Sequence, residues 1–223
     1  MAVPSWRREP EALDGTWTCF RQVDPQYPAL FHSAGEPVPS QVSGRWHRQG
    51  QGYAQYLSLA PAGAWAELAR YYSIRSAKRA RAQRRDLWVV RVEETGIADL
   101  TTFDAWDACG LDPRIAVAEH GPAQNLADEL RGAGFRGMTA PSAALTGTAN
   151  LTIFGERYEK VLTTTFGYWV NPDREAWLAC TLASPASQMP TALTTDTVFR
   201  TGKHEGYRAW LVQRGRRLPA DPP

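Results

Sequence analysis

The chain has little cysteine, no long apolar run and no leader-like start, and each shortage excludes a class of protein. Its three cysteines in 223 residues, Cys19, Cys109 and Cys180, form no CxxC pair and leave one thiol unpaired in any disulfide scheme, which favours a reducing compartment. No segment approaches the ~20 apolar residues of a membrane span, and the N-terminus lacks the apolar core of a signal peptide. We therefore expect a cytoplasmic protein without a membrane partner.

Metal-ligand spacing and a strong net charge are missing too. The four histidines show no ligand spacing with one another or with the cysteines, so no metal is expected. The net charge of +2 is too small to make the whole chain a polyanion binder. One basic run leaves a nucleic-acid-binding module open as a non-enzyme alternative. Such runs are more often solvated faces or docking surfaces, and this one lacks aromatic residues for base stacking after Tyr72. The run consists of Arg70, Arg75, Lys78, Arg79, Arg81, Arg84, Arg85 and Arg91.

Aromatic residues are plentiful, and strand-like segments outnumber helical ones. Nine tryptophans and eight tyrosines exceed the needs of a core of this size, so some should line a ligand pocket. Strands alternating with a few helices predict a mixed α+β fold and not a doubly wound one. Strands are predicted at residues 16–23, 52–60, 87–92, 98–106 (a strand edge passing into a short helix), 136–142, 149–155, 160–166, 176–183 and 206–214. Helices are predicted at residues 61–79 and 122–134.

The composition changes along the chain and predicts three parts. Residues 1–15 read as a flexible arm and residues 16–166 as the main domain. Residues 167–223 read as a C-terminal extension that is β-rich and ends in a frayed tail. Within the main domain, residues 24–51 are rich in Pro, Gly, Ser and Gln, and a loop of that length is usually functional or disordered.

A carboxylate at the edge of an apolar helix face is the first candidate for chemistry. Glu67 is three residues after Ala64 and four before Tyr71, so it borders the apolar face and is partly desolvated. It is either a rim glutamate paired with a local arginine or a functional carboxylate. The predicted buried face consists of Ala64, Trp65, Leu68, Tyr71 and Tyr72.

The loop before this helix favours the functional interpretation. Arg45 lies in a Gly44-Arg45-Trp46 turn, and a guanidinium is suited to bidentate capture of phosphate oxygens. Tyr56 is on the following strand, where its ring either joins the core or covers a flat heterocycle. Together, the arginine, the tyrosine and the half-buried glutamate suit a nucleotide whose ribose is to be attacked.

From Phe20 to Phe166 the chain resembles the RES-domain family. The resemblance depends on "FR" (20–21), "SGRWH" (43–47), "YLSLAPAGAWAEL" (56–68) and "QNLADELRGAGFRGMTAPSA" followed by "NLTIF" (124–154), in that order and spacing. It implies an ADP-ribosyltransferase-like mixed fold with a central split β-sheet and a few flanking helices.

The same resemblance implies a reaction and a partner. It implies cleavage of the nicotinamide–ribose bond of NAD+ by hydrolysis or phosphorolysis, in the toxin of a toxin–antitoxin pair neutralised by an Xre-like antitoxin. A minority of the family transfers ADP-ribose to a protein, so a mono-ADP-ribosyltransferase that modifies a host protein is the alternative enzyme.

Carried over to this sequence, the catalytic residues are Glu67, Arg45 and Ser142. Glu67 would stabilise the oxocarbenium-like ribose that forms when nicotinamide departs. Ser142, in "APSA", would hydrogen-bond the ribose or the carboxamide, or would only cap a turn. Some members use a hydroxyl shortly before the position of Gln124, where this chain has residues 121–123, Gly-Pro-Ala. Which hydroxyl fills the serine role therefore stays open.

The resemblance also implies which residues bind NAD+. Arg45, with Arg21, would hold the pyrophosphate, and Tyr56 would pack on nicotinamide or ribose. Gln124 completes the predicted binding set. In the alternative interpretation, Arg21 is an edge-strand cation and Gln124 is a solvated residue in the first turn of a helix.

Overall fold

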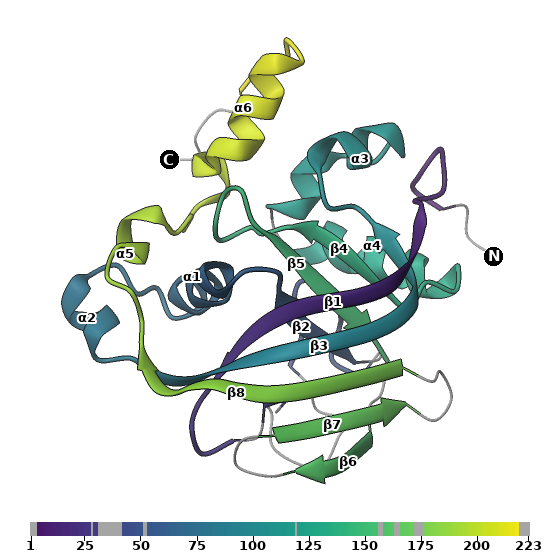
Figure 1. Cartoon of the computed structure of the whole chain (residues 1–223). Coiled ribbons are helices and arrows are strands. Elements are labelled where there is room, and N and C mark those ends of the chain that lie inside the picture. Colours follow the sequence, from purple (N-terminus) through teal and green to yellow (C-terminus); the bar gives the residue numbers. More distant parts are fainter. Residues whose placement is uncertain are drawn as a thin grey trace.

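The computed structural model describes residues 4–27, 29–30, 42–50, 53–118, 120–155, 158–162, 166–171 and 176–218. Over these ranges the chain forms a sheet with helices around it, the mixed α+β fold that the sequence predicts (Figure 1). The strands are β1 (Ala12–Val23), β2 (Ala54–Ser58), β3 (Arg84–Asp99), β4 (Gly137–Pro141), β5 (Ala149–Phe154), β6 (Tyr158–Leu162), β7 (Phe166–Asn171) and β8 (Ala176–Gln188). The helices are α1 (Pro61–Tyr71), α2 (Ala77–Arg81), α3 (Phe103–Ala108), η1 (Pro113–Ala116), α4 (His120–Gly132), α5 (Leu193–Asp196), η2 (Thr201–Lys203) and α6 (Glu205–Gln213).

Two long strands, β1 and β3, form the spine of the sheet. They pair antiparallel from Ala12 opposite Ala98 to Val23 opposite Asp86. The strand order is β1-β2-β5-β4-β3-β8-β7-β6, and the extra β1–β3 pairing closes the first five strands into a ring (Figure 1). Strand β3 is long enough to pair with β8 along its first part and, in parallel, with β4 near its end. The ring therefore places the loops after β4 and β2 beside one another, because β5 pairs with both strands.

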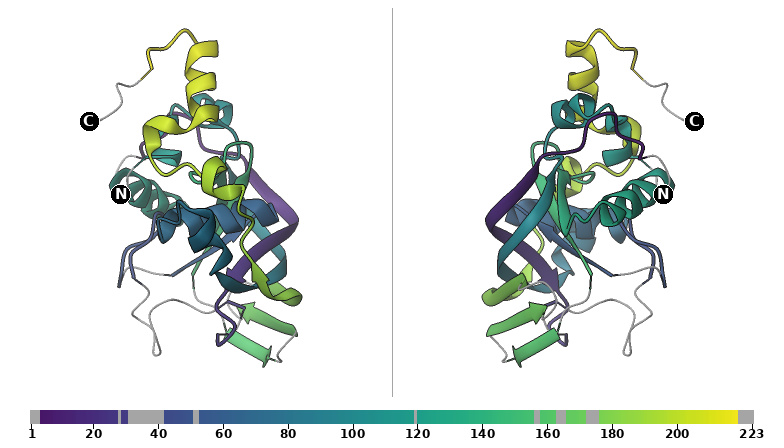
Figure 2. Two further views of the ribbon diagram at one scale, coloured as in Figure 1. Left: turned by 90° about the vertical axis from the view of Figure 1, so that its left-hand side faces the viewer. Right: turned by 90° about the vertical axis from the view of Figure 1, so that its right-hand side faces the viewer.

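Three groups of buried side chains hold this arrangement. One lies between the sheet and α3, α4 and α6, and it includes Trp106, Leu130 and Trp210. A second lines the ring, with Cys19 among its members, and the third joins α1 to α2 and α5 around Trp65. Figure 2 shows α6 at one end of the molecule and the β6–β7 hairpin at the opposite end. No helix in the ranges given above is long and apolar enough to cross a membrane.

Helix α1 is shorter than predicted. The prediction of one helix over residues 61–79 is wrong, because α1 ends at Tyr71 and α2 begins at Ala77. Ser73 has φ 51°, a left-handed conformation that ends the helix, and the Ile74 N–H donates back to the Ala69 carbonyl at 2.8 Å. The residue in this position is usually glycine, so a serine there does not signal the end of a helix.

The buried face of α1 also differs from the predicted one. Tyr71 and Tyr72 are exposed, at 75% and 48%, although both were expected to be buried. The helix packs against β1, β2 and α5, and such close packing on several sides needs small side chains. The buried residues are Gly63, Ala64, Trp65, Ala66 and Ala69.

The two ends of the chain also depart from the predictions. The strand predicted at residues 206–214 is wrong, because α6 occupies Glu205–Gln213. The flexible arm was predicted over residues 1–15, but residues 12–15 belong to β1, which begins at Ala12. The sheet is continuous across the boundary predicted at residue 166, since β8 pairs with β3. Residues 163–165 of a predicted strand, and 219–223 of the predicted tail, lie outside the described residues.

Candidate active site

Glu67 faces the loop between β4 and β5. Its Oε1 atom accepts a hydrogen bond from the Ser142 hydroxyl at 2.9 Å and another from the Asn150 amide at 2.7 Å. Within the described part of the chain, no hydrogen bond to Oε2 is found. The structure therefore brings Glu67 and Ser142 together, and among the described residues it leaves the second carboxylate oxygen without a hydrogen bond.

Ser142 is fully buried directly after β4, and it also shapes its own loop. Its hydroxyl oxygen accepts hydrogen bonds from the backbone N–H groups of Ala144 and Leu145, at 3.2 and 3.3 Å. Its carbonyl oxygen lies 3.0 Å from Nε2 of His204. The turn-capping interpretation of Ser142 is thus confirmed, and the same hydroxyl donates to Glu67. Its contact with a ligand stays a prediction.

Arg70, one turn after Glu67 on α1, belongs to this cluster and not to a solvated basic face. Its Nη1 group donates to the Ala143 carbonyl and, at 3.1 Å, to the Val198 carbonyl. Burial lowers the pKa of Arg70, and the charge of Glu67 acts in the opposite direction. The interpretation of the basic run as a solvated face is therefore wrong for Arg70.

The turn that carries Arg45 is fastened to β2 by Tyr56. The Tyr56 hydroxyl accepts a hydrogen bond from the Trp46 N–H at 2.9 Å, and it lies 2.8 Å from Nδ1 of His47. Glycine is required at position 44 because a Cβ there would lie 2.5 Å from the Tyr56 hydroxyl. Tyr56 therefore orders the turn, whatever its ring contacts.

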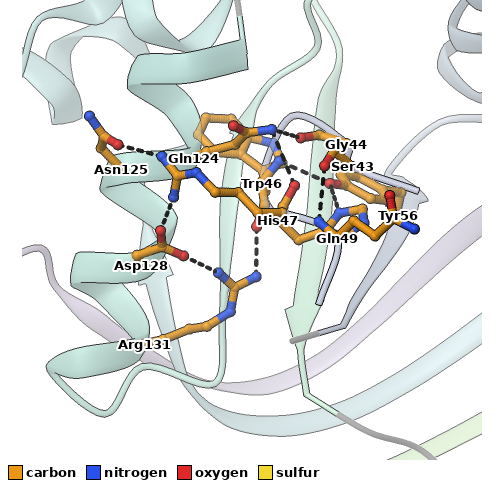
Figure 3. Close-up of polar contacts among 11 residues, drawn as sticks. Ser43, Gly44, Trp46, His47, Gln49, Tyr56, Gln124, Asn125, Asp128 and Arg131 are labelled. Atoms are coloured by element: carbon orange, nitrogen blue, oxygen red, sulfur yellow. Dashed lines mark hydrogen bonds and ion pairs between the residues drawn. The ribbon is translucent and has the colours of Figure 1, made fainter. Parts of the chain in front are cut away.

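Helix α4 fastens the same turn from the other side. Gln124 donates through Nε2 to the Gly44 carbonyl at 2.8 Å, and Arg131 donates to the Trp46 carbonyl at 2.6 Å. Figure 3 shows these side chains meeting the turn opposite Tyr56. Gln124 is thus not a merely solvated residue of the first turn of the helix. It contacts the Arg45 turn directly.

Arg45 itself is half-buried and close to two other charges. Its Nη1 group donates to the Ala118 carbonyl at 2.5 Å. Burial first, and then the charge of Arg70, lower its pKa to about 10, while Glu67 and Tyr56 act in the opposite direction. Two guanidinium groups beside a single carboxylate leave an excess of positive charge, which suits an anionic ligand.

Arg21 is placed differently. The neighbouring side chain on β1, Gln22, donates to the Ala64 carbonyl of α1, so Arg21 points to the opposite face of β1. Its guanidinium donates to the Ala29 carbonyl at 3.3 Å, and burial lowers its pKa to about 10. The role of Arg21 in binding NAD+ stays a prediction.

Asn150, Arg70 and His204 were not among the predicted site residues. Only Arg70 carried a signal, because a residue three positions after Glu67 lies on the same helix face. Asn150 and His204 reach the cluster from far along the chain, so no local spacing could identify them. In the ranges that the structure describes, no group of three His, Cys, Asp or Glu side chains could hold a metal ion.

The pattern that defines the RES domain matches residues 16–171. The chain belongs to the RES-domain family. A Mycobacterium tuberculosis protein named probable NAD(+) phosphorylase Rv3189 is 32% identical over 117 residues, which cover 52% of this chain and 55% of that protein. The chain thus matches about half the length of this relative.

The fold of the present chain is similar to that of a solved structure. A chain of the Mycobacterium tuberculosis MbcT–MbcA toxin–antitoxin complex superposes with a TM-score of 0.57 and 19% sequence identity. The match covers 82% of the present chain and 90% of the chain from the complex. At this identity the likeness shows a shared fold.

Proposed function

We propose that this RES-domain protein cleaves the nicotinamide–ribose bond of NAD+ and is the toxin of a toxin–antitoxin pair. The observation that carries the proposal is the Glu67 carboxylate, which is held on one oxygen by Ser142 and Asn150 and open on the other. A fixed, partly desolvated carboxylate stabilises positive charge that develops at an anomeric carbon.

The reaction follows from the same geometry. The bond between C1 of the ribose and the pyridinium nitrogen breaks, and its electron pair leaves with neutral nicotinamide. Glu67 faces the resulting oxocarbenium ion through Oε2, while Arg45 holds the pyrophosphate and Tyr56 packs on the ribose or nicotinamide. Water or inorganic phosphate then forms a bond to C1 through oxygen, which gives ADP-ribose or its 1-phosphate.

The comparisons support the proposal. The relative named as an NAD(+) phosphorylase favours NAD+ as the substrate, with phosphate among the acceptors. The shared fold with a chain of a toxin–antitoxin complex favours a protein antitoxin as partner. The family resemblance implies that this antitoxin is Xre-like. We also infer an ADP-ribosyltransferase-like fold, since β8 and β4 diverge along one edge of β3 and so split the sheet.

Incubation of the purified protein with NAD+ tests this function. With and without inorganic phosphate, we expect free nicotinamide together with ADP-ribose or ADP-ribose 1-phosphate, identified by mass spectrometry. If the folded protein, free of inhibitor, leaves NAD+ intact, the proposal is wrong. ADP-ribose found only on a protein acceptor would instead identify a mono-ADP-ribosyltransferase.

A further inference from the structure

The loop that carries Ser142 is bound by a segment far along the chain. We define the C-terminal segment as residues 189–213, which contain α5, η2 and α6. The chain between α5 and α6 passes beside the loop that joins β4 and β5 (Figure 1). This segment lies entirely beyond residues 16–171, the part of the chain that matches the family pattern.

Three successive carbonyl groups of this loop accept hydrogen bonds from the C-terminal segment or from Arg70. The Ser142 carbonyl lies 3.0 Å from Nε2 of His204, and the Ala144 carbonyl accepts from the Val198 N–H at 2.8 Å. The Ala143 carbonyl between them accepts from Arg70, which also donates to the Val198 carbonyl at 3.1 Å. The loop is therefore fixed at residues 142–144, and Arg70 on α1 contacts both the loop and the C-terminal segment.

His204 makes the contact nearest to the chemistry. Its Nδ1 atom accepts the Tyr207 N–H at 3.0 Å at the start of α6, so the ring proton must be on Nε2, which donates to the Ser142 carbonyl. The ring is 2% exposed, and the edge-to-face ring of Phe103 lies 5.7 Å away. Both nitrogens are thus used, and the imidazole links the first turn of α6 to Ser142.

The link continues from His204 to the carboxylate. The residue whose carbonyl His204 holds is the same residue whose hydroxyl donates to Glu67. A shift of the Ser142 backbone moves that hydroxyl, and Glu67 then keeps only the Asn150 amide as a donor. An active-site group displaced by about 1 Å can cost on the order of 100-fold in rate.

We propose that the C-terminal segment positions the active site through one side chain, His204, a positioning residue that holds Ser142 and, through it, the Glu67 carboxylate. The inference deepens the proposed function and depends on it for its kinetic readout. It assigns a task in the reaction to a part of the chain that the family pattern does not include.

Two substitutions at His204 separate positioning from helix capping. In His204→Asn the side chain can still accept the Tyr207 N–H as a helix cap, but it is too short to reach the Ser142 carbonyl. In His204→Gln the longer amide can still donate to that carbonyl, although it caps the helix less well. We expect kcat for nicotinamide release to fall by roughly 10- to 100-fold in His204→Asn at nearly unchanged KM for NAD+, and to stay within a few-fold in His204→Gln.

Trp210→Phe is the matched control within α6. It removes the hydrogen bond from the indole N–H to Asp104 at 2.8 Å and loosens α6 without touching the Ser142 loop. We expect its melting temperature to fall while kcat, measured well below that temperature, stays near the wild-type value. A wild-type kcat in His204→Asn, or an equal loss of kcat in Trp210→Phe, would overturn the proposal.

A second readout does not require activity. The backbone amides of Ala144 and Leu145 donate to the Ser142 hydroxyl, so hydrogen exchange at these amides reports on the loop. We expect faster exchange there in His204→Asn and wild-type exchange in Trp210→Phe. Unchanged exchange in His204→Asn contradicts the link. If the wild-type protein leaves NAD+ intact, the proposed function fails, and the exchange data still decide the link.

Discussion

The two oxygens of the Glu67 carboxylate have different surroundings. Oε1 has two neutral donors, Ser142 and Asn150, and neither of them neutralises the charge. The carboxylate is therefore held in place by neutral groups, and the charges that act on it are those of Arg45 and Arg70. Its half-buried position gives a lower effective dielectric than water. Such an arrangement suits a group that must stabilise a positive charge on a ligand.

Replacing Glu67 by glutamine tests this directly. Gln is nearly isosteric, and its amide oxygen can still accept from Ser142 and Asn150, so the variant should fold with little change and bind NAD+ comparably. It lacks the negative charge, and we expect turnover to fall by roughly 10²–10³, the scale of losing one preorganised electrostatic group. Thermal stability and nicotinamide release should be measured on the same sample. Full activity per molecule in a destabilised variant would contradict the catalytic role.

His204 should make folding stability sensitive to mild acid. Burial is the main cause that lowers the pKa of His204 below its ordinary value of 6.5. Arg70 also lowers it, and the Ser142 carbonyl and Glu205 act in the opposite direction. The unfolded chain therefore binds a proton more readily than the folded one, and stability falls as the pH drops through 6.5 towards the lower folded pKa. Above about pH 7.5 both states are neutral and the effect vanishes.

The measurement is the free energy of unfolding by urea between pH 7.5 and pH 5. The pKa of His120 is also lowered, so the slope of unfolding free energy against pH in the wild type does not report on His204 alone. The difference between wild type and His204→Asn isolates the contribution of His204, and we expect the variant to lose less stability on acidification. Equal slopes in the two proteins would show that His204 titrates alike in the folded and unfolded chains.

The family pattern named two single residues that the structure places in contact, although their roles stay predictions. Glu67 and Ser142 were expected on that basis, and they are in hydrogen-bond contact in the structure. Asn150 could not be predicted as a partner, because it reaches Glu67 only through the pairing of β5 with β2. Contacts between residues so far apart in sequence depend on sheet topology, which periodicity does not encode.

Among the elements of the fold, the turn at residues 44–47 is held from two sides and has little room to move. Gly44→Ala places a Cβ 2.5 Å from the Tyr56 hydroxyl, so either the turn or Tyr56 must shift and the Trp46 N–H loses its acceptor. We expect NAD+ affinity to fall by about tenfold, roughly 1.4 kcal/mol, measured by calorimetry. Gly132→Ala is the control, because nothing lies within 4 Å of the added carbon. Equal affinities in both variants would show that the turn does not position Arg45.

Helix α6 and the end of α1 show where sequence patterns failed for whole elements. The segment 206–214 is rich in residues that favour strands, yet its buried members Tyr207, Trp210 and Leu211 are spaced by three and four positions, as in a helix. Helix α1 ends at a left-handed serine, for which no propensity rule predicts a stop. The strands of the ring were easier to predict, since most of them alternate or form short apolar runs.

Across the whole molecule, two of the three buried clusters contain the three thiols: Cys109 is in the cluster around Trp106, and the other two are in the cluster that lines the ring. Cys19 and Cys180 are fully buried and Cys109 nearly so, and burial raises the pKa of Cys19 to about 12. We expect a thiol-specific disulfide reagent to label no cysteine in the native protein at pH 8, and to label three after unfolding in guanidinium. Absorbance of the released thiolate gives the count. Fast labelling of any cysteine without denaturant would show that one cluster opens locally.

The contact between Ser142 and His204 spans 62 positions of the chain. A ribosome therefore completes the Arg45 turn, α1 and the Ser142 loop before it has made the residue that fastens that loop. On the proposed function, a polypeptide that ends before His204 carries every predicted catalytic side chain and still consumes little NAD+. The order of synthesis therefore postpones the fastening of this loop until residue 204 has been made.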